Sequence, residues 1–119
     1  MKNIGILGAS GSVGTQGLDI IRQYPHAYKL VSFSVGKNID LANEIIEEFR
    51  PDICCVQNKE DVDKIRSTAI KVVYGNDGLM EIAAYHKNDM LLNSIMGSVG
   101  LKPTVHAIKH GIDIALANK

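Results

Sequence analysis

A glycine-rich loop near the start of the chain is the segment best suited to chemistry. Residues 8–14 read Gly-Ala-Ser-Gly-Ser-Val-Gly, follow a short apolar run and precede a helical run at residues 18–21. Glycines allow a tight strand-to-helix turn and close approach of a ligand to the backbone, and the free N–H groups of a helix start attract phosphate. The G-x-x-G-x-x-G spacing is weak evidence by itself, but its position favours dinucleotide binding over a bare structural turn. Ser10 and Ser12 could add hydroxyl donors to the same phosphates.

The end of the second expected strand bears on which dinucleotide would bind. Domains that bind NAD usually place a carboxylate there for the ribose 2′-hydroxyl, but residues 30–38 contain none, and Asp40 is the first acid. An acid would repel a 2′-phosphate, whereas Ser34, Lys37 and Asn38 offer charge and hydrogen bonds to one. The pattern favours NADP(H). The alternative is that Lys37 is a solvated loop lysine and that Asn38 caps the next helix.

Three other features carry weaker chemical signals. The loop at residues 96–100 contains two glycines and suits either the nicotinamide side of a dinucleotide site or a plain turn. His106 and His110 have a spacing that could share a metal, but the H-E-x-x-H pattern is absent, so we expect both to face solvent. Cys54 and Cys55 are adjacent, which suits neither a disulfide framework nor a C-x-x-C site, and we expect them to be reduced, buried strand residues.

The elements that position these residues alternate along the chain. Strands are expected at residues 3–7, 29–34, 53–56, 71–74, 90–94 and 113–116, with helical apolar spacing between them. Pro25 and Pro51 follow the first two helices, and Pro103 suits the first turn of the last one. Such alternation predicts an α/β fold of Rossmann type, a doubly wound, mainly parallel sheet with helices on both faces. The expected strand order is 3-2-1-4-5-6.

The composition is that of one soluble globular domain spanning residues 1–119. Hydrophobic residues make up 45% and charged residues 22%, and thirteen basic residues balance thirteen acidic ones. No global field would draw the chain to nucleic acid or to an anionic membrane, so neither is an expected partner. No apolar run is long enough for a signal peptide core or a membrane helix, and we expect a cytoplasmic protein.

Four segments together resemble one family, the 1-deoxy-D-xylulose 5-phosphate reductoisomerases. They are residues 6–14, 35–38, 97–104 and 115–119, in matching order and spacing, with the terminal Leu-Ala-Asn-Lys as the most specific piece. The resemblance implies isomerisation of 1-deoxy-D-xylulose 5-phosphate and its NADPH-dependent reduction to 2-C-methyl-D-erythritol 4-phosphate, in non-mevalonate isoprenoid biosynthesis. It also implies a cytoplasmic homodimer that needs Mg²⁺ or Mn²⁺ and is inhibited by fosmidomycin.

By the same resemblance, the chain corresponds to the amino-terminal NADPH-binding domain, truncated before the catalytic domain. The family's ligand contacts fall on nine positions of this sequence. They are Ser10, Gly11, Ser12 and Val13 for the pyrophosphate and adjoining ribose, Gly36, Lys37 and Asn38 for the adenosine ribose and its 2′-phosphate, Asn118 for the nicotinamide half and Lys119 for the substrate. The metal ligands are expected beyond this chain, which we expect to be inactive alone.

Two departures and two alternatives accompany this interpretation. Gly5 and Gly17 stand where the family usually has larger residues, and each would weaken its strand or helix by about 0.5–1 kcal/mol. Another NADP-dependent reductase shares the glycine loop but has no role for the terminal Leu-Ala-Asn-Lys. A noncatalytic NADP-sensing module would have no reason to place Asn118 and Lys119 at the nicotinamide end.

Overall fold

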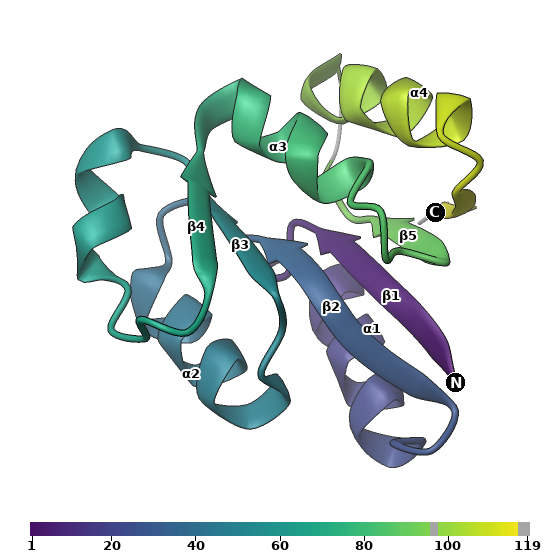
Figure 1. Ribbon diagram of the computed structural model, residues 1–119, viewed down its shortest axis with the longest axis horizontal. Coiled ribbons are helices and arrows are strands. Elements are labelled where there is room, and N and C mark those ends of the chain that lie inside the picture. The colour runs from purple at the N-terminus through teal and green to yellow at the C-terminus, as the bar shows by residue number, and fades with distance from the viewer. Residues whose placement is uncertain (96–97, 117–119) are drawn as a thin grey trace.

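The computed structural model describes residues 1–95 and 98–116, which form one sheet with helices on both faces (Figure 1). In chain order the elements are β1 (Lys2–Leu7), α1 (Ser12–Gln23), β2 (Tyr28–Ser34), α2 (Ile39–Phe49), β3 (Ile53–Val56), the 3₁₀ helix η1 (Lys59–Lys64), β4 (Lys71–Tyr74), α3 (Gly75–Ala83), β5 (Met90–Asn93), the 3₁₀ helix η2 (Ser98–Gly100), α4 (Leu101–Lys109) and β6 (Asp113–Leu116). All five neighbouring strand pairs are parallel. The expected doubly wound α/β fold is confirmed, and the six strands lie within one residue of their expected bounds.

The expected strand order was wrong. The observed order is β4-β3-β2-β1-β5-β6, so the fourth strand lies at the outer edge beside β3 and the fifth pairs with β1. Each right-handed crossover on a given face of the sheet adds the next strand on the same side of the preceding strand. The strand order therefore reverses only when a connection passes over the opposite face. The η1 connection stays on the face of α1 and α2, and the chain reverses only when α3 crosses the opposite face (Figure 1).

Asn43 of α2 fixes the η1 connection on that face. This buried side chain donates to the Lys64 carbonyl at 3.1 Å and accepts from the Arg66 N–H at 2.9 Å. Val62 and Ile65, on either side of the end of η1, pack into the same core as α2. The segment before β4 is therefore held against α2, which leaves β4 only the edge beside β3.

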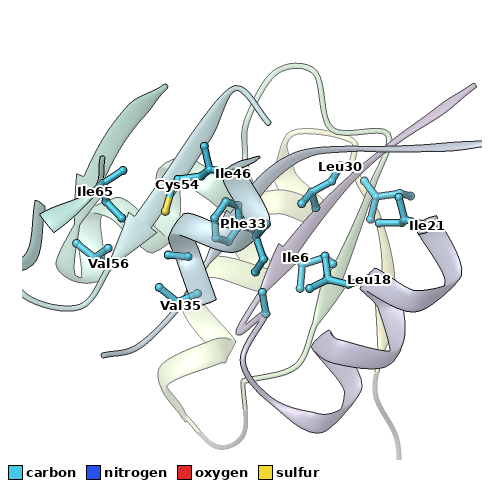
Figure 2. Close-up of a cluster of buried hydrophobic side chains, with 14 residues drawn as sticks. Ile6, Leu18, Ile21, Leu30, Phe33, Val35, Ile46, Cys54, Val56 and Ile65 are labelled. Atoms are coloured by element: carbon cyan, nitrogen blue, oxygen red, sulfur yellow. The ribbon is translucent and has the colours of Figure 1, made fainter. Parts of the chain in front are cut away.

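Two hydrophobic cores lie on the two faces of the sheet. The first is buried under α1 and α2 and is drawn in Figure 2, where Leu18 and Ile21 of α1 lie over Ile6 and Leu30 of the sheet. The second core joins α3 and α4 to the opposite face. Because alternate residues of a strand point to opposite faces and both faces are covered, β1 and β2 are buried on both sides over most of their length, and most of their buried residues are apolar.

Gly5 and Gly17 make close packing possible in this structure. A Cβ on Gly5 would lie 2.5 Å from the Ser32 hydroxyl and 2.7 Å from the Asn88 amide, two buried groups that hydrogen-bond to each other at 2.8 Å. A Cβ on Gly17 would lie 2.5 Å from the Leu92 side chain, so this part of α1 packs closely on β5. The conformational entropy that each glycine costs is therefore offset by contacts that a larger residue would disturb.

Cys54 and Cys55 are buried free thiols, as expected, and face opposite cores. Burial raises the pKa of both thiols to about 12, and the charge of Glu81 adds to the shift at Cys55. A buried thiol resists ionisation because the thiolate would lose its hydration. The folded protein should therefore protect both thiols from chemical modification at neutral pH.

These thiols predict a loss of stability in alkali. A thiol in the unfolded chain has a pKa of about 9.0, and each folded thiol has a pKa of about 12. The stability that the protonated thiols give the folded state is therefore fully present below pH 9 and is lost as the pH rises from 9 towards 12. The free energy of unfolding should fall by up to about 1.4 kcal/mol per pH unit for each thiol. Urea denaturation at several pH values between 7 and 10.5 measures this fall in the free energy of unfolding. The Cys54→Ala/Cys55→Ala double variant is the control, because its tyrosines and lysines titrate over the same range without the two thiols. An equal pH slope in both proteins would contradict the prediction.

Candidate functional site

A cavity of about 720 Å³ opens at the carboxyl ends of the strands, where parallel α/β sheets bind ligands. Its volume lies in the range of ligand pockets. Its wall includes Gly8, Ser10, Gly11, Ser34, Gly36, Gln57, Asn58, Asn76, Leu79 and Ser94. Of the described residues that line it, none is charged, so any charge that acts on a ligand there comes from the rim or from backbone dipoles.

The glycine loop reaches this cavity through a left-handed turn at Gly8, where φ is +80°. The Gly8 N–H donates to the Ser34 hydroxyl and the Ala9 N–H to the Ser34 carbonyl, both at 2.8 Å. Ser34 is buried at the end of β2 and fixes the loop. Its hydroxyl, which the sequence offers to a 2′-phosphate, is thus engaged with the loop backbone as an acceptor.

The amino terminus of α1 has free N–H groups that point to an anion site. Gly11 is the N-cap residue, no side chain caps the helix, and its first turn contains no acidic residue. Within residues 1–95 and 98–116, no acceptor pairs with the N–H of Ser12 or Val13. Unpaired N–H groups and the positive end of the helix dipole together attract phosphate.

Ser94 holds the other side of this helix start. Its hydroxyl accepts from the Gly14 N–H at 3.1 Å, and it lies 2.8 Å from the position that a Cβ on Gly11 would occupy. A Cβ on Gly14 would lie only 2.2 Å from the Gly8 carbonyl oxygen. The loop and the first turn of α1 therefore touch backbone to backbone, which only glycine permits at residue 14.

The loop after β2 brings a second set of expected residues to the rim. Gly36 lines the cavity, whereas the exposed Lys37 and Asn38 lie beside it and do not line it. Asn38 is the N-cap of α2 and accepts from the Leu41 N–H at 3.2 Å, so the capping role considered as the alternative is confirmed. Contacts of Lys37 and Asn38 with a ligand stay a prediction.

The other expected residues have mixed outcomes. Ser10 and Gly11 line the cavity, and Ser12 and Val13 form the helix start next to it. Asn118 and Lys119 lie outside the described residues, as do two residues of the loop at 96–100. His110 is exposed as expected but His106 is half-buried, with ring centroids 4.5 Å apart.

Sequence reasoning missed the polar residues that follow β3, β4 and β5. Gln57, Asn58 and Asn76 line the cavity, and Ser94 both lines it and holds α1. Each directly follows a strand or begins the next segment, which is the position where α/β folds place ligand contacts. That positional rule could have found them, whereas their residue types carry no distinctive motif.

No helix within residues 1–95 and 98–116 is long and apolar enough to cross a membrane. The same residues contain no group of three or more His, Cys, Asp or Glu side chains arranged to hold a metal ion.

Comparisons with known proteins agree on one family. The family model described as 1-deoxy-D-xylulose 5-phosphate reductoisomerase matches residues 4–119. A protein of that name from Macrococcus caseolyticus (strain JCSC5402) is 90% identical over the whole chain, which covers 32% of that protein. One from Bacillus thuringiensis subsp. konkukian (strain 97-27) is 51% identical, again over 100% of this chain and 32% of the relative.

Solved structures of the same family share the fold. A DOX-P reductoisomerase in complex with NADPH, fosmidomycin and magnesium superposes with a TM-score of 0.91 at 30% identity, covering 99% of this chain and 30% of that chain. The Zymomonas mobilis enzyme in complex with NADPH has a TM-score of 0.89 at 25% identity, covering 98% of this chain and 32% of that chain. The chain thus spans roughly a third of the length of the curated relatives it matches.

Proposed function

The chain belongs to the 1-deoxy-D-xylulose 5-phosphate reductoisomerase family, and we propose that it is the NADPH-binding domain of such an enzyme. The longer protein would isomerise 1-deoxy-D-xylulose 5-phosphate and reduce it with NADPH to 2-C-methyl-D-erythritol 4-phosphate. The observation that carries the proposal is the uncapped start of α1 at a cavity formed by the carboxyl ends of the strands.

The residues of this chain fit a dinucleotide phosphate. Gly11 and Gly14 let the backbone close around the start of α1, and the N–H groups of Ser12 and Val13 point out for a pyrophosphate. We propose that Ser10, Gly11, Ser12 and Val13 bind this group. When bound, NADPH supplies a hydride to the substrate, and the domain's task is to hold it in place.

The loop after β2 would select NADPH over NADH. Gly36 lies on the cavity wall, and the exposed Lys37 and Asn38 stand at its rim without a carboxylate beside them. We propose that these three residues bind the adenosine ribose and its 2′-phosphate, with Lys37 as the cation. Asn118 would contact the nicotinamide half and Lys119 the substrate.

In this proposal, the metal ion and the homodimer are features of the full-length enzyme. Since the described residues offer no ligand cluster, the Mg²⁺ or Mn²⁺ that the family is expected to use would be held outside this chain. The proposal further includes a cytoplasmic homodimer that takes a small-molecule substrate. A structure of a relative is described as a complex with fosmidomycin and magnesium, which supports the small-molecule site in that protein.

Cofactor selectivity is the direct test. We expect NADPH to bind roughly ten- to a hundredfold more tightly than NADH, because a charge-assisted phosphate contact contributes about 1.5–3 kcal/mol. Isothermal titration calorimetry with both cofactors measures the ratio. The Lys37→Ala variant should lose most of the preference, whereas Lys29→Ala, an exposed lysine on β2 at the opposite end of the strand, should keep it. Equal affinities in the unmodified chain would defeat the NADP assignment.

The 119-residue chain alone is expected to bind NADPH without turning over the substrate. Hydride transfer needs the substrate held about 3–3.5 Å from the nicotinamide, and alignment of that kind lowers the activation barrier by roughly 7–11 kcal/mol. By the family resemblance, Lys119 is the one residue of this chain that would contact the substrate. NADPH oxidation with substrate and Mn²⁺ present, followed by nicotinamide absorbance, measures turnover with a full-length family member as positive control. Substrate-dependent oxidation by the chain alone would overturn this expectation.

A further inference from the structure

Two histidines at the end of α4 have no part in the proposed function. His106 lies in the last turn of α4 and His110 is its C-cap residue, on the helix that lies beside α3 (Figure 1). No residue of α4 lines the cavity that the described residues form. The ring centroids of the two histidines lie 4.5 Å apart, with the rings at 62° to each other. Residues four apart on a helix lie one above the other on the same face, so the two imidazoles lie side by side.

A contact with the helix backbone fixes which nitrogen of His110 holds the proton. Its Nδ1 lies 2.8 Å from the His106 carbonyl oxygen. A carbonyl oxygen only accepts, so Nδ1 is the protonated nitrogen, and in the neutral ring Nε2 has the free lone pair. The His110 backbone N–H donates instead to the Ala107 carbonyl at 3.0 Å, so the ring supplies the donor that the His106 carbonyl lacks at the helix end. Metal-bound histidines are oriented in the same way, by donating their other ring N–H to a carbonyl or carboxylate.

Two neighbouring imidazoles suit a divalent transition metal ion. Their spacing is that of the two histidines in an H-E-x-x-H helix, which bind zinc from one helix face. Ring nitrogens favour Zn²⁺, Ni²⁺ and Cu²⁺, whereas Mg²⁺ and Mn²⁺ favour oxygen ligands. The negative end of the helix dipole lies at the same turn and favours a cation there.

The surroundings of the pair make the expected binding reversible. Within residues 1–95 and 98–116, no further His, Cys, Asp or Glu side chain joins the two histidines in a group of three. Water would therefore complete the coordination of an ion held by the pair. Lys109 is exposed in the same turn and has the same sign of charge as the ion, which lowers the affinity.

We propose that His106 and His110 form a two-imidazole site for a divalent transition metal ion such as Ni²⁺, Cu²⁺ or Zn²⁺, with Nε2 of His110 as one of its two ligands. This site lies outside the cofactor cavity and does not depend on the proposed function. An ion bound to both rings links two successive turns at the end of α4, so it stabilises the folded chain.

Nickel binding by the untagged 119-residue chain at pH 7.5 tests the site. Calorimetry should show one Ni²⁺ ion bound per chain and no binding of Mg²⁺ at the same concentrations. His106→Gln and His110→Gln should each weaken Ni²⁺ binding by more than about tenfold, because a single imidazole lacks the second, intramolecular contact. His26→Gln and His86→Gln replace the other two histidines, both exposed, and should leave the affinity unchanged.

A variant that moves one histidine tests the geometry of the pair. Ile108→His combined with His110→Gln keeps the number of histidines but spaces the pair two residues apart, where side chains do not face each other, so Ni²⁺ binding should stay weak. Ni²⁺ should also raise the Tm of the unmodified chain, followed by circular dichroism, but not the Tm of His106→Gln. Failure of the unmodified chain to bind Ni²⁺, a loss below about tenfold in either single variant, or recovery of binding in the moved-histidine variant would overturn the site. None of these measurements uses NADPH, so their outcome is independent of the proposed function.

Discussion

The Gly11→Val variant is expected to lose more than ~100-fold in NADPH affinity while it remains folded. Gly11 is the N-cap of α1 and lines the cavity, so a branched side chain would stand where the backbone and the pyrophosphate have to meet. Its backbone angles, φ −74° and ψ 168°, are open to any residue. The nearest atom to a new Cβ is the Ser94 hydroxyl at 2.8 Å, which is the end of a movable side chain.

Calorimetric titration and circular dichroism of the same protein samples separate lost binding from lost structure. Gly11→Ala should give an intermediate affinity because its single methyl group intrudes less. Gln23→Ala, at an exposed position at the far end of α1, should bind NADPH within about threefold of the unmodified chain. If Gly11→Val bound NADPH normally, the glycine loop would be a structural turn and the cofactor site would lie elsewhere.

The Gly14→Ala variant is expected to lose about 3 kcal/mol in free energy of unfolding, at the upper end for an overpacked residue. A Cβ at this position would lie 2.2 Å from the Gly8 carbonyl oxygen and 2.8 Å from the Ala9 Cα. Both are backbone atoms of the turn between β1 and α1, so no side-chain rotation relieves the contact. The start of α1 would have to move away from the loop, and NADPH binding should weaken with it.

Gly17→Ala is the matched control, since the residue lies three positions further along the same helix. The closest atom there is Cδ2 of Leu92 at 2.5 Å, the end of a flexible side chain. An alanine in a helix gains about 1 kcal/mol over glycine, which offsets much of the repacking cost. Urea denaturation should therefore place Gly17→Ala within about 1 kcal/mol of the unmodified chain. Equal losses in the two variants would show that the contact between residues 8 and 14 is not the cause.

The amino-acid sequence was enough to predict the elements, the fold class and the end of the sheet at which the cavity lies. These depend on signals carried by neighbouring residues: apolar runs of strand length, prolines after helices, and a glycine loop between a strand and a helix. The rule that α/β folds bind ligands at the carboxyl ends of their strands then locates the site without further information. Ser10, Gly11 and Gly36 accordingly lie on the cavity wall.

The position of β4 depends on tertiary contacts, and so does the part of the cavity wall that carries Gln57 and Asn76. No pattern within residues 59–70 says which face of the sheet they cover, because Asn43, which holds them there, lies more than twenty positions away on α2. Ser34 and Ser94 likewise support the glycine loop from β2 and from the end of β5. Such contacts join residues distant in the chain, and their energy exists only once the sheet has formed.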